Sequence, residues 1–257
     1  KTKSISDGHS IAMDFEIKID STTTLYLSPS FTKNEIKNKN IGFDATYDET
    51  GTALNENTSD NKWSSNNNTF KNSLYFYKQL KKKGRGINFS MSNENSKNDS
   101  DLFTKTTTTF LQSGNTDDNR DQFRKDNSKN DSFRAEIGYS EPLRDSLVFN
   151  FKTTYNYKKS NEIRETYDFD SGLNSYSNFN DLLSNDIISR TSSVIPMVGI
   201  SLRKKKIRGS ISMGTEIINF NNQSNYLANK TSVNKNYIYP KMNGYLSITL
   251  GKSKSIY

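Results

Sequence analysis

Residues 11–19 read IAMDFEIKI, and every second residue of this stretch is apolar: Ile11, Met13, Phe15, Ile17 and Ile19. Three of the four residues between them are charged. Successive side chains of a β-strand point to opposite faces, so this alternation predicts a strand with one apolar and one polar face. The fold class depends on how often the pattern recurs.

The same alternation recurs along the whole chain. It is found in residues 25–31, 70–80, 87–91, 133–139, 147–157, 194–202, 207–217 and 242–250, and residues 255–257 are expected to begin one more strand. About 9–10 strands are therefore visible, and the chain is predicted to be all-β.

The connections between these strands alternate between short and long. The short ones are residues 20–22, 81–86, 141–146, 204–206 and 251–254, whereas residues 32–69, 93–132, 160–190 and 219–236 are long and rich in Asn, Asp, Ser and Thr. Outer-membrane barrels have short periplasmic turns and long extracellular loops. The spacing predicts a transmembrane antiparallel β-barrel with long polar loops, and alternation in residues 41–47 predicts that some strands project beyond the membrane.

Strand length separates a membrane barrel from a soluble β-sandwich, since both show alternation. The predicted strands run about 9–12 residues, which suits a tilted membrane strand better than a typical soluble strand of about 5–6. Tyrosines near the predicted strand ends are expected to form interfacial girdles: Tyr75, Tyr77, Tyr139, Tyr155, Tyr157, Tyr237 and Tyr239. These features favour the barrel, and the sandwich or a soluble adhesin stays as the alternative.

Composition excludes most catalytic chemistry. The 257 residues contain no Cys and a single His, His9, so thiol catalysis, disulfides and most His-based sites are excluded. We expect His9 to be a turn residue. The chain is accordingly predicted not to be an enzyme, with no catalytic, cofactor-binding or metal-binding residues.

The net charge of +8 raises the question of a nucleic-acid partner. Ten of the 36 Lys and Arg residues lie at two predicted turns, in residues 78–85 and 203–208, where they suit anionic lipid head groups better than a nucleic-acid groove. Acidic strings at residues 98–101, 117–119 and 168–170 could hold calcium, but none has EF-hand spacing. Trp63, in a predicted Asn-rich loop, is either a ligand-stacking residue or a loop anchor.

Four segments resemble a known family: YKQLKKKGRGINFSM (residues 77–91), YSEPLRDSLVFNFKTTYNY (139–157), RETYDFD (164–170) and YPKMNGYLSITLGKSKSIY (239–257). They are similar in character and order to the outer membrane protein beta-barrel family, the barrel part of TonB-dependent-receptor-like proteins. The resemblance implies the outer membrane of a Gram-negative bacterium and a barrel of about 22 strands. It also implies an N-terminal plug, energy from TonB and an extracellular solute as ligand.

Residues 1–257 are expected to be a single outer-membrane barrel region, an excerpt of a longer chain without its plug or signal peptide. The predicted function is import or surface binding of an extracellular solute. A non-transport adhesin or a structural subunit of an envelope complex is the alternative, and the sequence does not identify the ligand.

Overall fold

The structure is a computed structural model that describes residues 1–112, 114, 116–226, 229–251 and 254–256. These residues form one antiparallel sheet and contain no helix, which confirms the all-β prediction. The described part of the chain therefore has no helix long and apolar enough to cross a membrane.

Twelve strands make up the sheet: β1 (Thr2–Ala12), β2 (Phe15–Asp20), β3 (Thr23–Tyr47), β4 (Ala53–Gln79), β5 (Gly86–Phe110), β6 (Asp118–Arg144), β7 (Leu147–Asp170), β8 (Ser175–Phe179), β9 (Asn185–Arg203), β10 (Ile207–Tyr226), β11 (Asn229–Gly251) and β12 (Lys254–Ile256). The main path follows chain order, β1-β3-β4-β5-β6-β7-β9-β10-β11-β12, while β2 pairs with β3 and β8 with β7. Each neighbour on this path is therefore the next strand along the chain, except that β2 lies between β1 and β3 and β8 lies between β7 and β9. The expected strand at residues 255–257 is observed as β12, although Tyr257 lies outside the described residues.

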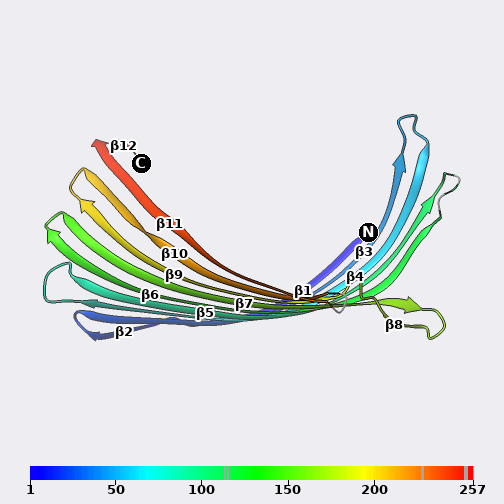
Figure 1. The fold of residues 1–257 in the computed structure, drawn as a ribbon, viewed down its shortest axis with the longest axis horizontal. Coiled ribbons are helices and arrows are strands. Elements are labelled where there is room, and N and C mark those ends of the chain that lie inside the picture. The colour runs from blue at the N-terminus through cyan, green and yellow to red at the C-terminus, as the bar shows by residue number, and fades with distance from the viewer. Residues whose placement is uncertain (113, 115, 227–228, 252–253, 257) are drawn as a thin grey trace.

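The sheet is open and bent. Its strands run along the longest dimension of the molecule and spread out on both sides of a narrow waist, where β11 at one end and β3 and β4 at the other rise on the same side, whereas β2 and β8 do not (Figure 1). Across the described residues no ladder joins β1 to β11 or β12, so the sheet has two free edges.

The long loops predicted at residues 32–69, 93–132, 160–190 and 219–236 are wrong. Most of these residues continue the strands, so β4 and β6 reach 27 residues each and the expected length of 9–12 is also wrong. The cause is side-chain pairing across strands, as in the amide contact from Asn219 to Asn236 (2.7 Å) and the hydroxyl contact from Ser65 to Asn98 (2.6 Å). Polar residues on both faces can form strands when both faces are wet.

The decisive stretch at residues 11–19 is split into two strands by a residue on its partner. The break at Met13 and Asp14 lies opposite Pro29 of β3, whose carbonyl accepts a hydrogen bond from the Met13 N–H at 3.0 Å. Proline has no N–H to return a ladder bond, so the pairing lapses there. The register is the same on both sides of the break, with Ala12 opposite Ser30 and Phe15 opposite Leu27.

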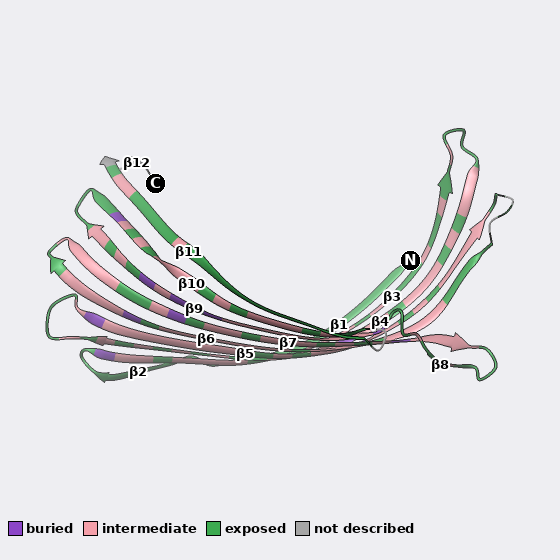
Figure 2. Cartoon of the chain, in the orientation of Figure 1, coloured by how far each residue is buried: buried purple, intermediate pink, exposed green. Residues whose placement is uncertain are grey.

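The sheet is a single layer and has almost no core. Only Ile195 and Met197 are buried hydrophobic residues among those described, and most of the chain is exposed or half-buried (Figure 2). A soluble sandwich would place a second sheet against the apolar face. The described residues form one sheet only, so the sandwich alternative has no support in this fold.

Candidate functional site: an apolar band and a polar face

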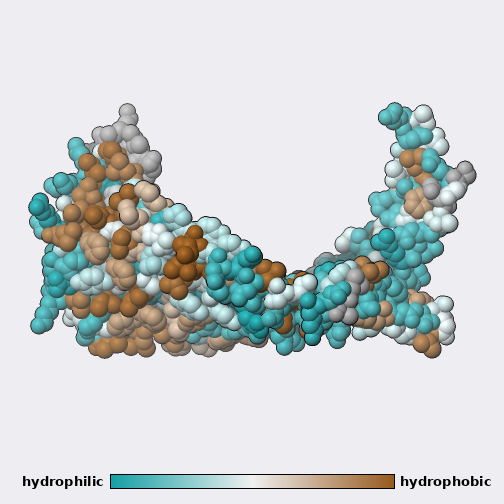
Figure 3. Space-filling model, in the orientation of Figure 1, coloured by the Kyte–Doolittle hydropathy of each residue, from teal (hydrophilic) through white to brown (hydrophobic). Residues whose placement is uncertain are grey.

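The apolar side chains gather on one face and toward one end of the sheet. The strand register places nine of them in one row across nine strands: Phe15, Leu27, Leu74, Met91, Ala135, Tyr155, Val194, Ile217 and Ile238. We call this side of the sheet the apolar face and the other side the polar face. In Figure 3 the hydrophobic surface lies mainly over the end of the sheet with the short turns. The opposite end, where the tips of the β3–β4 and β5–β6 hairpins lie, is mostly hydrophilic.

The apolar residues form a band of nearly constant height, the apolar band. It covers residues 147–157 of β7, 194–202 of β9, 207–217 of β10 and 238–248 of β11. These segments have about 9–11 residues, the length of a membrane-crossing β-strand. Within the band, Met213 is 56% exposed and Met242 is 69% exposed, so more than half of each residue is left uncovered by the sheet.

Behind the apolar band, the polar face carries a connected set of charged and amide groups. The Glu136 carboxylate accepts hydrogen bonds from Arg134 (2.8 Å) and from the Thr154 hydroxyl (3.0 Å), and the Lys152 ammonium lies 3.7 Å away. Arg134 also donates to Asn156, which donates in turn to Ser193 (3.0 Å). Charged groups of this kind need water or other polar groups around them, so the polar face suits the lumen of a barrel better than contact with lipid.

The expected tyrosine girdle is wrong for four of its seven members. Tyr75 lies in the same cross-strand row as Glu136 and Thr154, and the register places Tyr77, Tyr237 and Tyr239 on the polar face too. Tyr139, Tyr155 and Tyr157 do lie on the apolar face. Nearness to a strand end does not tell on which face of the sheet a tyrosine lies, because a shift of one residue along the strand moves the side chain to the other face.

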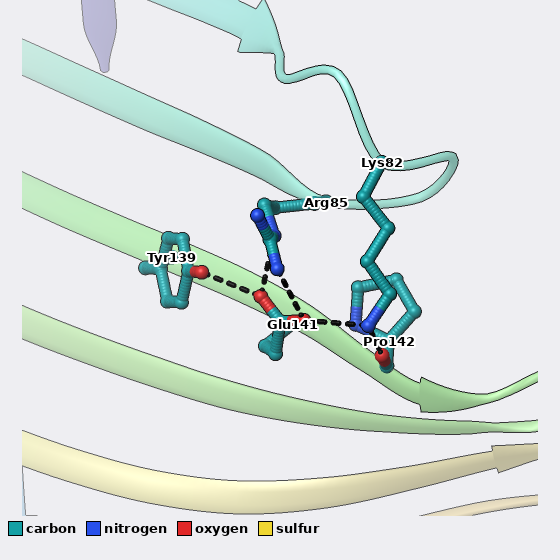
Figure 4. A network of polar contacts seen from close by, with 5 residues as sticks. All are labelled: Lys82, Arg85, Tyr139, Glu141 and Pro142. Atoms are coloured by element: carbon teal, nitrogen blue, oxygen red, sulfur yellow. Dashed lines mark hydrogen bonds and ion pairs between the residues drawn. The ribbon is translucent and has the colours of Figure 1, made fainter.

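At the end of the sheet with the short turns, residues 77–91 and 139–157, two of the segments that resemble the barrel family, are joined by a network of hydrogen bonds and ion pairs (Figure 4). Arg85, in the turn between β4 and β5, donates two hydrogen bonds to the Glu141 carboxylate, at 2.6 and 2.9 Å. Lys82 donates to the same carboxylate at 2.7 Å and also to the Pro142 carbonyl, and the Tyr139 hydroxyl donates to Glu141. These contacts tie neighbouring hairpins to each other.

The network stabilises the charged form of its acid. Hydrogen bonds from Arg85, then Lys82, then Tyr139 hold the pKa of the Glu141 carboxyl well below its usual range. In the turn between β2 and β3, hydrogen bonds from Thr22 and Thr23 lower the pKa of Asp20 to about 2. Both carboxylates thus stay ionised at neutral pH, and Glu141 offsets one of the two positive charges of Lys82 and Arg85.

Toward the hairpin tips an aromatic cluster that the sequence did not reveal lies on the extension of the apolar face. It consists of Phe103, Phe123, Tyr167, Phe169, Tyr176 and Phe179, with Phe103 and Phe123 stacked at 4.6 Å between ring centroids. The Tyr176 hydroxyl donates to Asp121 at 2.7 Å, and burial together with this bond raises the pKa of Tyr176 to about 12. Its members come from four strands whose register is not readable from the sequence, so no local motif marks it.

The two remaining candidate residues, Trp63 and His9, both lie within strands of the sheet. Trp63 is half-buried within β4, between Asn38 and Leu102, and the predicted loop around it does not exist. His9 lies within β1, not in a turn as predicted, and its Nε2 is 3.8 Å from a carboxylate oxygen of Asp7.

The acidic strings do not converge on a cation site. Asp99 pairs with Lys97 at 2.6 Å, and Asp168 accepts hydrogen bonds from Gln122 and Asn180. Asp170 accepts hydrogen bonds from the N–H groups of Gly172 and Leu173 in the turn that follows it. Within the described ranges no group of three or more His, Cys, Asp or Glu residues is close enough to hold a metal ion.

No family model matches the chain, and neither does any curated protein. Among solved structures it is similar to the ferric citrate transporter FecA in its unliganded form, with 10% identity and a TM-score of 0.41 over 98% of this chain and 43% of that one. It is also similar to the ferric yersiniabactin uptake receptor FyuA from Yersinia pestis, with 6% identity and a TM-score of 0.36 over 98% of this chain and 45% of that one. The chain therefore spans less than half the length of these two proteins.

Proposed function

We propose that this chain forms part of the wall of a β-barrel in the outer membrane of a Gram-negative bacterium. The observation that carries the proposal is the apolar band, which is exposed on one face of a single-layer sheet at the height of a membrane-crossing strand. Lipid would cover the band, and the polar face with Glu136, Arg134 and Lys152 would line the lumen. An exposed band of this extent in water would be an aggregation site.

The proposal also has to account for the two free edges of the sheet, at β1 and at β12. Strand edges cannot face lipid, because each unpaired N–H or C=O group costs several kcal/mol there. The wall that contains β1 and β12 is therefore completed by further strands, for which the rest of a longer chain is the natural source. The resemblance to TonB-dependent-receptor-like barrels fits this arrangement, with a plug against the polar face.

In this proposal the protein binds or imports an extracellular solute and is not an enzyme. The polar hairpins beyond the apolar band supply a large wet surface for a ligand, and the polar face supplies a passage or a plug contact. An adhesin or a structural envelope subunit would use the same hairpins without a passage. Growth on a candidate solute that requires both this gene and TonB would support import, and binding without such a requirement would support the alternative.

The orientation of the wall is tested by cysteine labelling, which is free of background within residues 1–257 because they contain no Cys. We expect a membrane-impermeant maleimide to label Thr50→Cys and Leu173→Cys in intact cells, because both lie at hairpin tips, and Leu173 is 70% exposed. Lys83→Cys and Lys205→Cys, at the short turns, should be labelled only after permeabilisation. Tyr176 is a poorer site than Leu173, since its side chain packs in the aromatic cluster.

Permeabilised cells, in which all four variants should react, are the control for reactivity. Labelling of the short-turn variants alone in intact cells would reverse the proposed orientation. Labelling of all four in intact cells would contradict a membrane wall.

A further inference from the structure

The charge of this protein is concentrated at one end of the sheet. Residues 80–85, 141–146 and 203–208, at three short turns, contain ten Lys and Arg residues and two acids, a net charge of +8 that equals the formal charge of the whole chain. The rest of the chain is thus electrically balanced. An excess this localised marks one rim of the sheet rather than a general property of the protein.

The structure joins the three turns into one continuous edge, the basic rim. The Lys82 side chain reaches Glu141 and Pro142 of the next hairpin, and the Arg203 N–H donates to the Ser146 carbonyl at 2.8 Å. The Thr249 N–H then donates to the Lys206 carbonyl at 2.8 Å, so the edge continues to β11. Turns that lie far apart in the sequence therefore present their charges side by side.

Most of these charges have no acidic partner. Glu141 pairs only with Lys82 and Arg85, while eight exposed basic residues of the rim make no ion pair within the described part of the chain: Lys81, Lys83, Arg144, Arg203, Lys204, Lys205, Lys206 and Arg208. Leu143, between them, is 52% exposed. The rim thus combines uncompensated cations with apolar side chains directly below the apolar band.

The opposite end of the sheet has the reverse sign. The hairpin tips at residues 48–52, 111–118, 170–174 and 180–184 contain six acids and no Lys or Arg. A charge difference between the two ends, on either side of an apolar band, resembles the asymmetry that places basic segments beside anionic lipid.

We infer that the basic rim binds the phosphate groups of anionic glycerophospholipids in the inner leaflet of the outer membrane. This inference rests on the proposed function, because it needs the apolar band to lie in the bilayer. Cations held at the border of an apolar surface can meet a lipid phosphate while the acyl chains cover the band. The Glu141 network contributes by fixing the turn that carries Lys81 and Lys83 against the neighbouring hairpin.

The test compares the binding of phosphatidylglycerol and phosphatidylethanolamine to the full-length protein in micelles, by native mass spectrometry. One variant changes five rim lysines to Gln: Lys81, Lys83, Lys204, Lys205 and Lys206. The matched control changes five exposed lysines that have no ion pair among the described residues and lie away from the rim: Lys3, Lys33, Lys62, Lys129 and Lys158. We expect the preference for phosphatidylglycerol to fall by about tenfold or more in the rim variant and to persist in the control.

Salt gives a second measurement on the unmodified protein. The preference should vanish at about 1 M salt, where electrostatic screening acts within about 3 Å. Equal loss in the two variants, or a preference that ignores salt, would overturn the inference. A rim-dependent preference for lipid A over phosphatidylglycerol would also overturn it, because lipid A occupies the outer leaflet.

An error in the proposed membrane wall and an error in the proposed lipid binding give different experimental results. If the full-length protein stays soluble and monodisperse without detergent, the proposed membrane wall is wrong. If it inserts and resists protease but shows no rim-dependent lipid preference, only the inference about the basic rim is wrong.

Discussion

A lysine in place of Phe151 is expected to cost about 2–4 kcal/mol of folding free energy in a bilayer, the cost of a cation on the lipid face near the midplane. Phe151 lies in one row of the apolar band with Tyr139, Val198, Met213 and Met242, near the middle of its height. Phe151 is 40% exposed, so a large part of its ring is open on the apolar face. The measurement is reversible unfolding of the complete protein in vesicles.

The matched control is Asn243→Lys, on the polar face opposite Ser212. Asn243 is exposed, and the register places it beside Met242 on the other face, so a lysine there should cost little. Asn150 would be a poorer control, because it hydrogen-bonds to Ser140 and Ser201. Equal losses for Phe151→Lys and Asn243→Lys would show that the alternation does not mark a lipid boundary.

Gly214→Ala is expected to destabilise the sheet by about 1–3 kcal/mol, as other overpacked sites do. A Cβ on Gly214 would overlap the Pro196 carbonyl oxygen and lie 3.0 Å from the Met197 Cα, so the backbone of β9 would have to move. The ladder between β9 and β10 already lapses beside Pro196, which has no N–H to donate. Further separation would expose backbone groups at membrane depth, where they cannot be solvated.

Gly244→Ala, in the adjacent strand, controls for the general effect of adding a methyl group. The nearest atom to a Cβ on Gly244 is the Ser210 carbonyl oxygen at 3.5 Å, an ordinary contact. Its effect on the unfolding free energy should stay within about 0.5 kcal/mol. If the two variants unfold at the same denaturant concentration, the close approach of β9 and β10 at Gly214 is not a feature of the folded protein.

The apolar band was predictable because alternation is a local signal. Residues 147–157 and 207–217 show it without any knowledge of their neighbours, and the register then aligns Phe151 with Met213 through β9. The proximity of Glu141 to Arg85 was not predictable from either segment alone. It follows from the pairing of β5 with β6, which is a long-range property.

The polar hairpins were not predictable as strands, because the hydrogen bonds that stabilise them join side chains of neighbouring strands and leave no pattern within one segment of sequence. Asn95 and Asp131 resemble loop residues in the sequence, but they are opposite each other and hydrogen-bonded at 2.7 Å. The effect of Pro29 also depends on a partner strand. It interrupts the facing strand between β1 and β2 and leaves its own strand, β3, continuous. Local propensity is thus overridden by the partner strand.

The central claim, that one face of the sheet meets lipid, is tested most directly by a nitroxide scan along β10 in the complete protein reconstituted in vesicles. Labels at Ile207, Ile211, Met213 and Ile217 should collide more with oxygen than with a water-soluble nickel chelate. Labels at Arg208, Ser210, Ser212 and Glu216 should show lower oxygen accessibility, so that the ratio of the two alternates with a period of two. A ratio that is flat along residues 207–217, or a nickel chelate that reaches both faces equally, would contradict the account.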